Sequence, residues 1–163
     1  IFNHMKFKQL IKLYESEQAG PPYTRRTRYG ETIYYKDPEH KIMHRTEKDP
    51  RTGLTLPAYI KDSGTKWWMI DNKLHRDEKN PRTGLSLPAV ETSDGITSWY
   101  KNNTLHRLDG PAIELSNGTE EWYINGIELS PKEIEEQKQK IALNNRVTSD
   151  TDNAIGGLFD ELH

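Results

Sequence analysis

Short runs of aromatic and β-branched residues alternate with polar turns along the middle of the chain, most compactly between Thr97 and Gly126. Such residue types favour strands. The turns include Asn102-Asn103 and Asn125-Gly126, and Asn-Gly is a strong signal for a two-residue hairpin loop. The pattern therefore predicts β-hairpins. Polar triplets with a glycine close the partner strands at Gly64, Gly95 and Gly118.

The hairpin pattern recurs with a fixed period. His44-Arg45, His75-Arg76 and His106-Arg107 are 31 residues apart (75 − 44 = 106 − 75 = 31), and a Pro-Ala pair follows each of them. A period of this length is typical of a repeat array. The sequence thus predicts three full units closed by a fourth half unit. The aromatic pairs that flank the units are Tyr34-Tyr35, Trp67-Trp68, Trp99-Tyr100 and Trp122-Tyr123.

Two of the three units carry a longer connection between the His-Arg and Pro-Ala pairs. These connections contain eleven residues, whereas the third contains only Leu108, Asp109 and Gly110. Both insertions, at 48–56 and 79–87, include the string PRTGL and should project from the same edge of the array. Such insertions often form the binding surface of repeat proteins, but they could also be longer hairpin loops and nothing more. The candidate partner-binding residues are Arg51, Leu54, Leu56, Arg82, Leu85 and Leu87.

Segments of different character flank the array. Residues 5–18 place apolar side chains at i, i+3, i+4 and i+7, which predicts a helix that Gly and Pro stop at 19–22. Ser130, Pro131 and Glu133 form a capping-box pattern, which predicts a helix across the end of the sheet. Residues 144–153 have the composition of a linker. Further on, Leu158 and Phe159 are candidate partner-binding residues of an acidic amphipathic tip.

Together these segments predict a mainly β fold, an antiparallel meander of stacked β-hairpin repeats with an N-terminal helix and a C-terminal capping helix. We expect an N-terminal helix within 1–22, the repeat array over 23–130, the capping helix over 131–143 and a flexible acidic tail over 144–163. Residues 1–4 before Met5 have the form of a vector remnant. Only 33% of the residues are hydrophobic and 29% are charged, a composition that suits an array whose units each bury one stripe.

Composition also narrows the classes of function. The net charge of −2 provides no overall attraction to phosphate. The lack of cysteine excludes disulfides and thiol catalysis, and it fits a place in the cytoplasm of a host cell. No apolar run is long enough to span a bilayer, so we expect no membrane partner.

The repeated histidines are the obvious candidates for catalysis or for a metal site, and their repetition argues against both. A catalytic site is one asymmetric group of residues, and a metal site needs several histidine nitrogens about 2 Å from one ion. We therefore expect no enzyme activity, no metal and no cofactor. We expect the arginines to bond turn carbonyls or acids such as Asp77 and Asp109. The predicted structural residues are His44, Arg45, His75, Arg76, His106, Arg107, Trp68, Trp99 and Trp122.

The string LHRLDGPAIE in the third unit, with the closing WYING before a polar helix, resembles the LHRxDGPA repeat proteins of tailed bacteriophages and large viruses. That family looks like a relative of the MORN-type β-hairpin repeats. The resemblance covers about residues 32–143, and in the first two units the PRTGL insertion replaces the Asp-Gly. It implies the architecture and a phage origin, but it carries no catalytic residues.

Two hypotheses of function follow. The first is a non-enzymatic phage interaction protein that binds and inhibits a host protein, for instance an AAA+ protease such as the ATP-dependent protease Lon. A homodimer through a sheet edge is a further expectation. The second is a protein that binds nucleic acid through exposed tryptophans and the cations Arg25, Arg26 and Arg28, or that contacts a sliding clamp through the acidic tail. Core packing is the commoner role of a periodic aromatic column.

Overall fold

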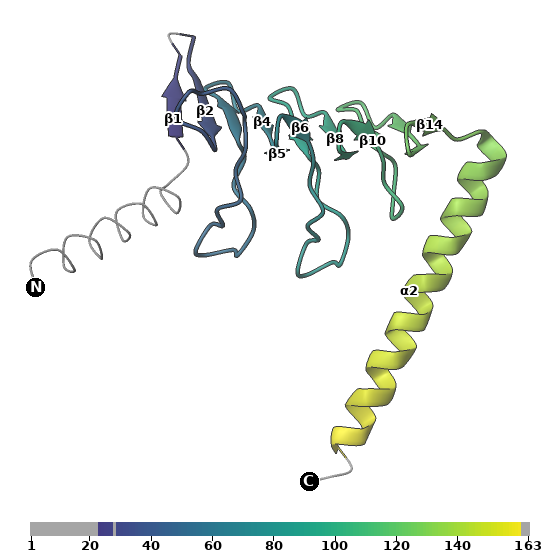
Figure 1. Ribbon diagram of the computed structural model, residues 1–163. Helices are drawn as coiled ribbons and strands as arrows, with labels where there is room; N and C mark the ends of the chain where they lie inside the picture. Colours follow the sequence, from purple (N-terminus) through teal and green to yellow (C-terminus); the bar gives the residue numbers. More distant parts are fainter. Residues whose placement is uncertain (1–22, 28, 161–163) are drawn as a thin grey trace, which may run out of the picture.

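A computed structural model describes residues 23–27 and 29–160, with side chains described up to residue 147. Arg28 and the helix expected within 1–22 lie outside the described residues. The described chain is mainly β with one helix near its C-terminal end, which confirms the predicted fold class at that level (Figure 1). The strands follow one another in a long row, and the helix descends from the end of that row.

Eight short strands form one antiparallel sheet in the order β1-β2-β3-β4-β7-β8-β11-β12. Neighbours in space are mostly neighbours in sequence, because the chain advances along the row unit by unit. The strands are short because the chain leaves the sheet again within each unit. Their bounds are β1 Tyr23–Arg26, β2 Glu31–Tyr35, β3 Tyr59–Lys61, β4 Lys66–Trp67, β7 Val90–Glu91, β8 Thr97–Ser98, β11 Ile113–Glu114 and β12 Glu120–Glu121.

The chain also forms three small hairpins beside the sheet. Both residues of each hairpin loop have positive φ, for instance 52° at Asn102 and 66° at Asn103. Asparagine and glycine tolerate this conformation, which type I′ loops require. Each of the three tryptophan-containing runs was expected as one strand. The structure splits them at Trp68, Trp99 and Trp122, where the chain passes from the large sheet to a small hairpin. The hairpins are β5 (Met69–Ile70) with β6 (Lys73–Leu74), β9 (Tyr100–Lys101) with β10 (Thr104–Leu105), and β13 (Tyr123–Ile124) with β14 (Ile127–Glu128).

Successive hairpins are bonded to one another through their loops. The Asn103 N–H donates to the Leu74 carbonyl at 2.9 Å, and the Leu74 N–H donates to Asn103 Oδ1 at 2.6 Å. The preceding unit repeats the pair, since the Asn72 N–H donates to the Met43 carbonyl at 2.9 Å and Met43 donates to Asn72 Oδ1 at 2.7 Å. Each unit is therefore fixed to the next at the hairpins as well as in the sheet.

The core is a narrow column that runs along the row of units. Ala58, Ala89 and Ala112 are completely buried, at 0% exposure, and they alternate with tryptophans that are 6% exposed. Each alanine lies where the backbones of adjacent strands meet, so a larger side chain there would have to displace its neighbours. The tryptophans of the column are Trp68, Trp99 and Trp122.

The helix α2 (Pro131–Asp160) begins directly after the last hairpin. Its start is the predicted capping box, in which the Ser130 N–H donates to a Glu133 carboxylate oxygen at 2.8 Å and Ser130 Oγ lies 2.6 Å from the same oxygen. The expected end at residue 143 is wrong, because the helix continues through the segment 144–153 that we expected to be a linker. That segment is polar but contains neither Gly nor Pro, so nothing in it breaks a helix.

Candidate interaction surface

One arginine holds each unit together. The Arg76 guanidinium carbon lies 4.0 Å from the centre of the Trp68 ring, while Nη1 donates to the Pro88 carbonyl at 3.1 Å and Nε to Glu78 at 3.3 Å. A guanidinium can do all of this because its planar face stacks while its edges donate. The equivalent contacts are made by Arg45 with Tyr34, Pro57 and Glu47, and by Arg107 with Trp99, Pro111 and Asp109.

The acid that pairs with Arg76 is Glu78, so the expectation that a repeat arginine bonds Asp77 is wrong. In an extended segment alternate residues point to the same side, and the acid two positions after the arginine is therefore the one in reach. Asp77 instead lies 3.0 Å from His75 and 3.8 Å from Lys101. In the third unit Asp109 has the position of Glu78 and pairs with its arginine, as expected.

These acids also bind the base of the preceding insertion. Both oxygens of Glu78 accept the Thr55 N–H at 2.9 Å. One oxygen of Asp109 accepts the Ser86 N–H at 2.7 Å and the Ser86 hydroxyl at 2.8 Å. Burial raises the pKa of Asp109, but the hydrogen bonds from Arg107 and Ser86 outweigh burial and hold that pKa below its usual value. The pKa of Glu78 is lowered against burial in the same way, by Thr55 and Arg76.

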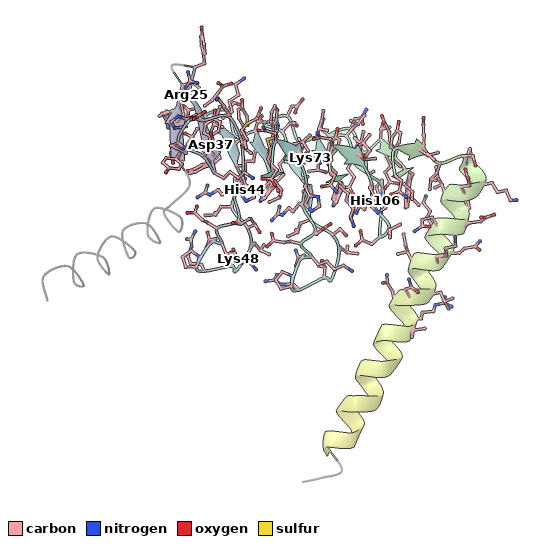
Figure 2. The ribbon with its side chains drawn as sticks, viewed as in Figure 1. Arg25, Asp37, His44, Lys48, Lys73 and His106 are labelled. Atoms are coloured by element: carbon pink, nitrogen blue, oxygen red, sulfur yellow. The ribbon has the colours of Figure 1, made fainter. Side chains whose placement is uncertain are left out.

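Each histidine bonds the hairpin of the following unit. Nδ1 of His44, His75 and His106 accepts a backbone N–H from that hairpin. The donors are Asp71 at 3.2 Å, Asn102 at 3.2 Å and Asn125 at 3.1 Å. His44 and His106 are well separated along the row (Figure 2). Among the described residues no group of three or more His, Asp or Glu side chains is placed to hold a metal ion.

The tryptophans take part in fixing the insertions. Nε1 of Trp68 donates to the Thr55 carbonyl at 2.7 Å, and Nε1 of Trp99 donates to the Ser86 carbonyl at 2.9 Å. One face of each of these rings is covered by the stacked arginine of its unit, and each tryptophan is only 6% exposed, so neither face is open to a nucleic-acid base. Trp122 closes the row, with Lys138 of α2 lying 5.6 Å from the centre of its ring.

The two insertions form a pair of loops with the same conformation. The first loop (residues 48–56) and the second loop (residues 79–87) project side by side from one side of the sheet (Figure 1). In the first loop the Gly53 N–H donates to the Asp49 carbonyl at 2.8 Å, and in the second the Gly84 N–H donates to the Asn80 carbonyl at 2.8 Å. The two glycines have φ values of 69° and 70°. The chain thus presents two copies of one loop on a common base.

The predicted partner-binding residues of the loops are placed unevenly. Arg51 and Arg82 are exposed, and Leu85 is 37% exposed, at the end of the second loop. Leu54, Leu56 and Leu87 are half-buried. The side chains of Leu158 and Phe159 lie outside the described residues. In the basic segment of the nucleic-acid hypothesis, Arg26 pairs with Asp62 at 3.0 Å.

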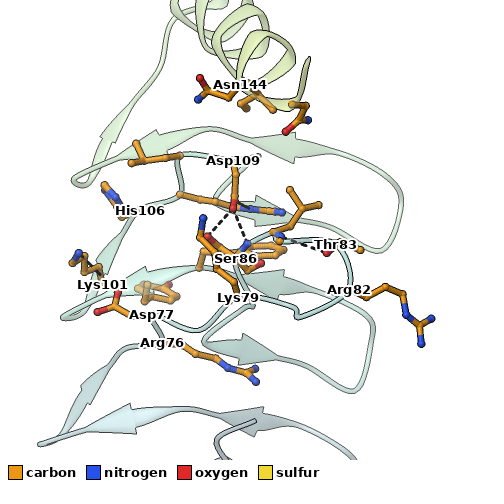
Figure 3. A pocket seen from close by; sticks show the side chains of 18 residues that line it. Arg76, Asp77, Lys79, Arg82, Thr83, Ser86, Lys101, His106, Asp109 and Asn144 are labelled. Carbon is orange, nitrogen blue, oxygen red and sulfur yellow. Dashed lines mark hydrogen bonds and ion pairs between the residues drawn. The ribbon is translucent and has the colours of Figure 1, made fainter. Parts of the chain in front are cut away.

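A cleft of about 830 Å³ separates the second loop from α2 (Figure 3). Its two sides are held near each other by Gln137 of α2, whose side-chain amide donates to the Leu108 carbonyl at 2.6 Å. The sequence did not predict this cleft, because its formation depends on how α2 leaves the last hairpin. The exposed or half-buried residues that line it include Lys79, Arg82, Leu85, Lys101, Leu108 and Ile141.

No family model, curated protein or solved structure matches the chain. Among the described residues, no helix combines the length and the apolar character that crossing a bilayer requires. The geometry of the two loops and of the cleft beside them is therefore the basis for a functional proposal.

Proposed function

We propose that the protein is a non-enzymatic binding module whose two loops grip a protein partner. The resemblance to phage repeat proteins makes a host protein the partner that we propose, and the binding inhibits it. The ATP-dependent protease Lon is the first candidate to assay. A homodimer through a free edge of the sheet is compatible with this role, because the loops project away from the row of strands.

The observation that supports this proposal is the repetition of one loop conformation on a rigid base. Thr55 and Ser86, at the ends of the two loops, are each bound by a tryptophan and an acid of the next unit. A loop held in this way loses little conformational entropy on binding, which favours affinity. Exposed Arg51 and Arg82 at equivalent positions supply the residue type that is enriched at protein interfaces.

The chain itself provides the variant that tests the proposal. In the third unit Leu108, Asp109 and Gly110 join the same elements without a long loop. Replacing residues 46–56 and 77–87 by Leu-Asp-Gly removes both loops and keeps an acid two positions after each arginine. The sheet of this double replacement is therefore expected to form, and far-UV circular dichroism and thermal unfolding check that it does.

The assay is capture of stoichiometric partners from a bacterial lysate by the full chain and by the double replacement. We expect the full chain to recover a protein that the folded double replacement does not, and purified Lon is tested in parallel for inhibition of its peptidase activity. Equal recovery by both proteins would show that the loops are not the binding surface. Recovery of nucleic acid alone, with a steep loss at higher salt, would favour the second hypothesis instead.

A further inference from the structure

We propose that the cleft between the second loop and α2 binds an acidic peptide segment that carries a large apolar side chain. Such an occupant presupposes the proposed function, because the segment belongs to the protein partner. The cleft distinguishes the surroundings of the second loop from those of the first, since α2 descends beside the second loop (Figure 1).

The cations of the two loops differ in their pairing. In the first loop Arg51 lies 3.5 Å from Asp49, and Lys48 lies 4.0 Å from Glu78 of the next unit. In the second loop Asn80 replaces that aspartate, so the loop carries one negative charge fewer.

Within the described residues, the side chains of Arg82 and Lys79 have no acidic partner within ion-pair distance, and both line the cleft. Asp109 has the position of Glu78 in the next unit and binds Arg107 and Ser86, but it forms no ion pair with Lys79 like the one between Glu78 and Lys48. Two cations are thus available to a ligand in the second loop, whereas their counterparts in the first loop are already paired.

Figure 3 shows Arg82 reaching outward at one end of the cleft and Lys101, which lies 3.8 Å from Asp77, at the other. Cations at both ends favour an extended ligand with several negative charges over a single small anion. Between them the lining is partly apolar, with Leu108 at 55% exposure, Leu85 at 37% and Ile141 of α2 half-buried. A ligand that combines carboxylates with an apolar side chain matches both parts of this surface.

A peptide fits these features better than a nucleic acid does. The Trp99 ring that lines the cleft is 6% exposed and lies under the Arg107 guanidinium at 3.8 Å, so this tryptophan is not open for base stacking.

The experiment is a selection of binders from a random-sequence peptide library on the immobilised full chain. We expect the enriched peptides to have net negative charge and at least one large apolar residue. Their affinities are then measured by fluorescence anisotropy with the wild type, Arg82→Glu and the control Lys73→Glu, which reverses the charge of an exposed lysine of β6 outside both loops and the cleft. We expect Arg82→Glu to weaken binding about fivefold to tenfold, and Lys73→Glu to change it by less than about twofold.

A further variant, Leu108→Ser, tests the apolar part of the site and should weaken the same peptides. Enriched peptides without net negative charge, or the absence of enrichment, would refute the proposal. Equal weakening by Lys73→Glu and Arg82→Glu would also refute it, because the peptides would then respond to the overall charge of the protein and not to the cleft. A single-stranded DNA oligonucleotide that binds the wild type and not Arg82→Glu would assign the cleft to nucleic acid instead. Loss of the proposed function is recognised separately, through unchanged partner capture by the double loop replacement.

Discussion

The substitution Asp109→Asn tests how strongly the repeat array depends on its acid links. Asp109 is the acceptor shared by two donors from different units, Nε of Arg107 at 2.9 Å and the N–H of Ser86 at 2.7 Å. Asparagine has nearly the same shape but only one acceptor oxygen. In either orientation of the amide, its NH₂ group therefore faces a donor, and one of the two links is lost.

The cost can be worked out from these contacts. A hydrogen bond to a charged group contributes about 1.5–3 kcal/mol, and a donor left unsatisfied in a buried place costs a similar amount. The Arg107 side chain is only 6% exposed, so its charge is poorly hydrated, but Glu114 at 2.8 Å still pairs with it in the variant. We therefore expect Asp109→Asn to lower the free energy of unfolding by about 2–3 kcal/mol.

The pH dependence of this loss follows from the lowered pKa of Asp109. A carboxylate whose pKa is lower in the folded state stabilises the fold above its unfolded pKa, about 4 for aspartate, and that contribution is lost as the pH falls through the folded value. The stability difference between wild type and Asp109→Asn should be complete at neutral pH and should shrink below about pH 4.

Urea unfolding followed by tryptophan fluorescence measures both effects. The matched control is Asp77→Asn, which changes the same residue type in the preceding unit. The Asp77 side chain is 63% exposed, and its contacts with His75 and Lys101 are surface pairs, so we expect a loss below about 1 kcal/mol. The reasoning fails if the two variants are equally stable, or if the deficit of Asp109→Asn is the same at pH 3 and pH 7.

Two further predictions concern the core column and the start of α2. Ala89→Leu adds volume at a position with 0% exposure, and we expect a loss of at least about 1–3 kcal/mol in urea unfolding; wild-type stability would contradict the packing of the column. Ser130→Ala removes the hydroxyl that bonds Glu133 in the capping box. It should cost about 1 kcal/mol and reduce the helical signal in circular dichroism, whereas an unchanged signal at all temperatures would show that the cap does not matter.

The hairpins and their turns could be predicted from the sequence because their causes are local. Asn102-Asn103 and Asn125-Gly126 have the positive φ values that a two-residue hairpin loop requires. The aromatic and β-branched residues that predict the flanking strands lie next to these loops in the sequence. The repeats then placed the insertions in equivalent positions. Each tryptophan-containing run was predicted as one continuous strand but forms two short ones, since nothing in the local sequence shows that the chain changes sheet at Trp68.

The contacts that link one unit to the next could not be predicted in the same way. The hydrogen bond from Ser86 to Asp109 spans 23 residues, and it depends on the distance between adjacent units in space. The choice of Glu78 over Asp77 depends on the direction of side chains in an extended segment. The continuation of α2 past residue 143 was missed because a polar composition was given more weight than the lack of a helix breaker.

One feature of the sequence is related to the cleft. Aligning the two PRTGL loops sets Asn80 opposite Asp49, a change of charge at an otherwise equivalent position. That difference could have indicated that the second loop faces different surroundings from the first. The charge difference could be interpreted only with the structure, which shows that α2 descends beside the second loop and not beside the first.

Among the described residues, each unit is bonded to the units before and after it, so the number of units in the row can change without altering these contacts. A duplicated unit would meet the same histidine, arginine and acid contacts on either side, and would add one more loop at the same spacing. Growth of this kind would widen the reach of the molecule toward a larger target while leaving the existing loops and the terminal helix in their present relation.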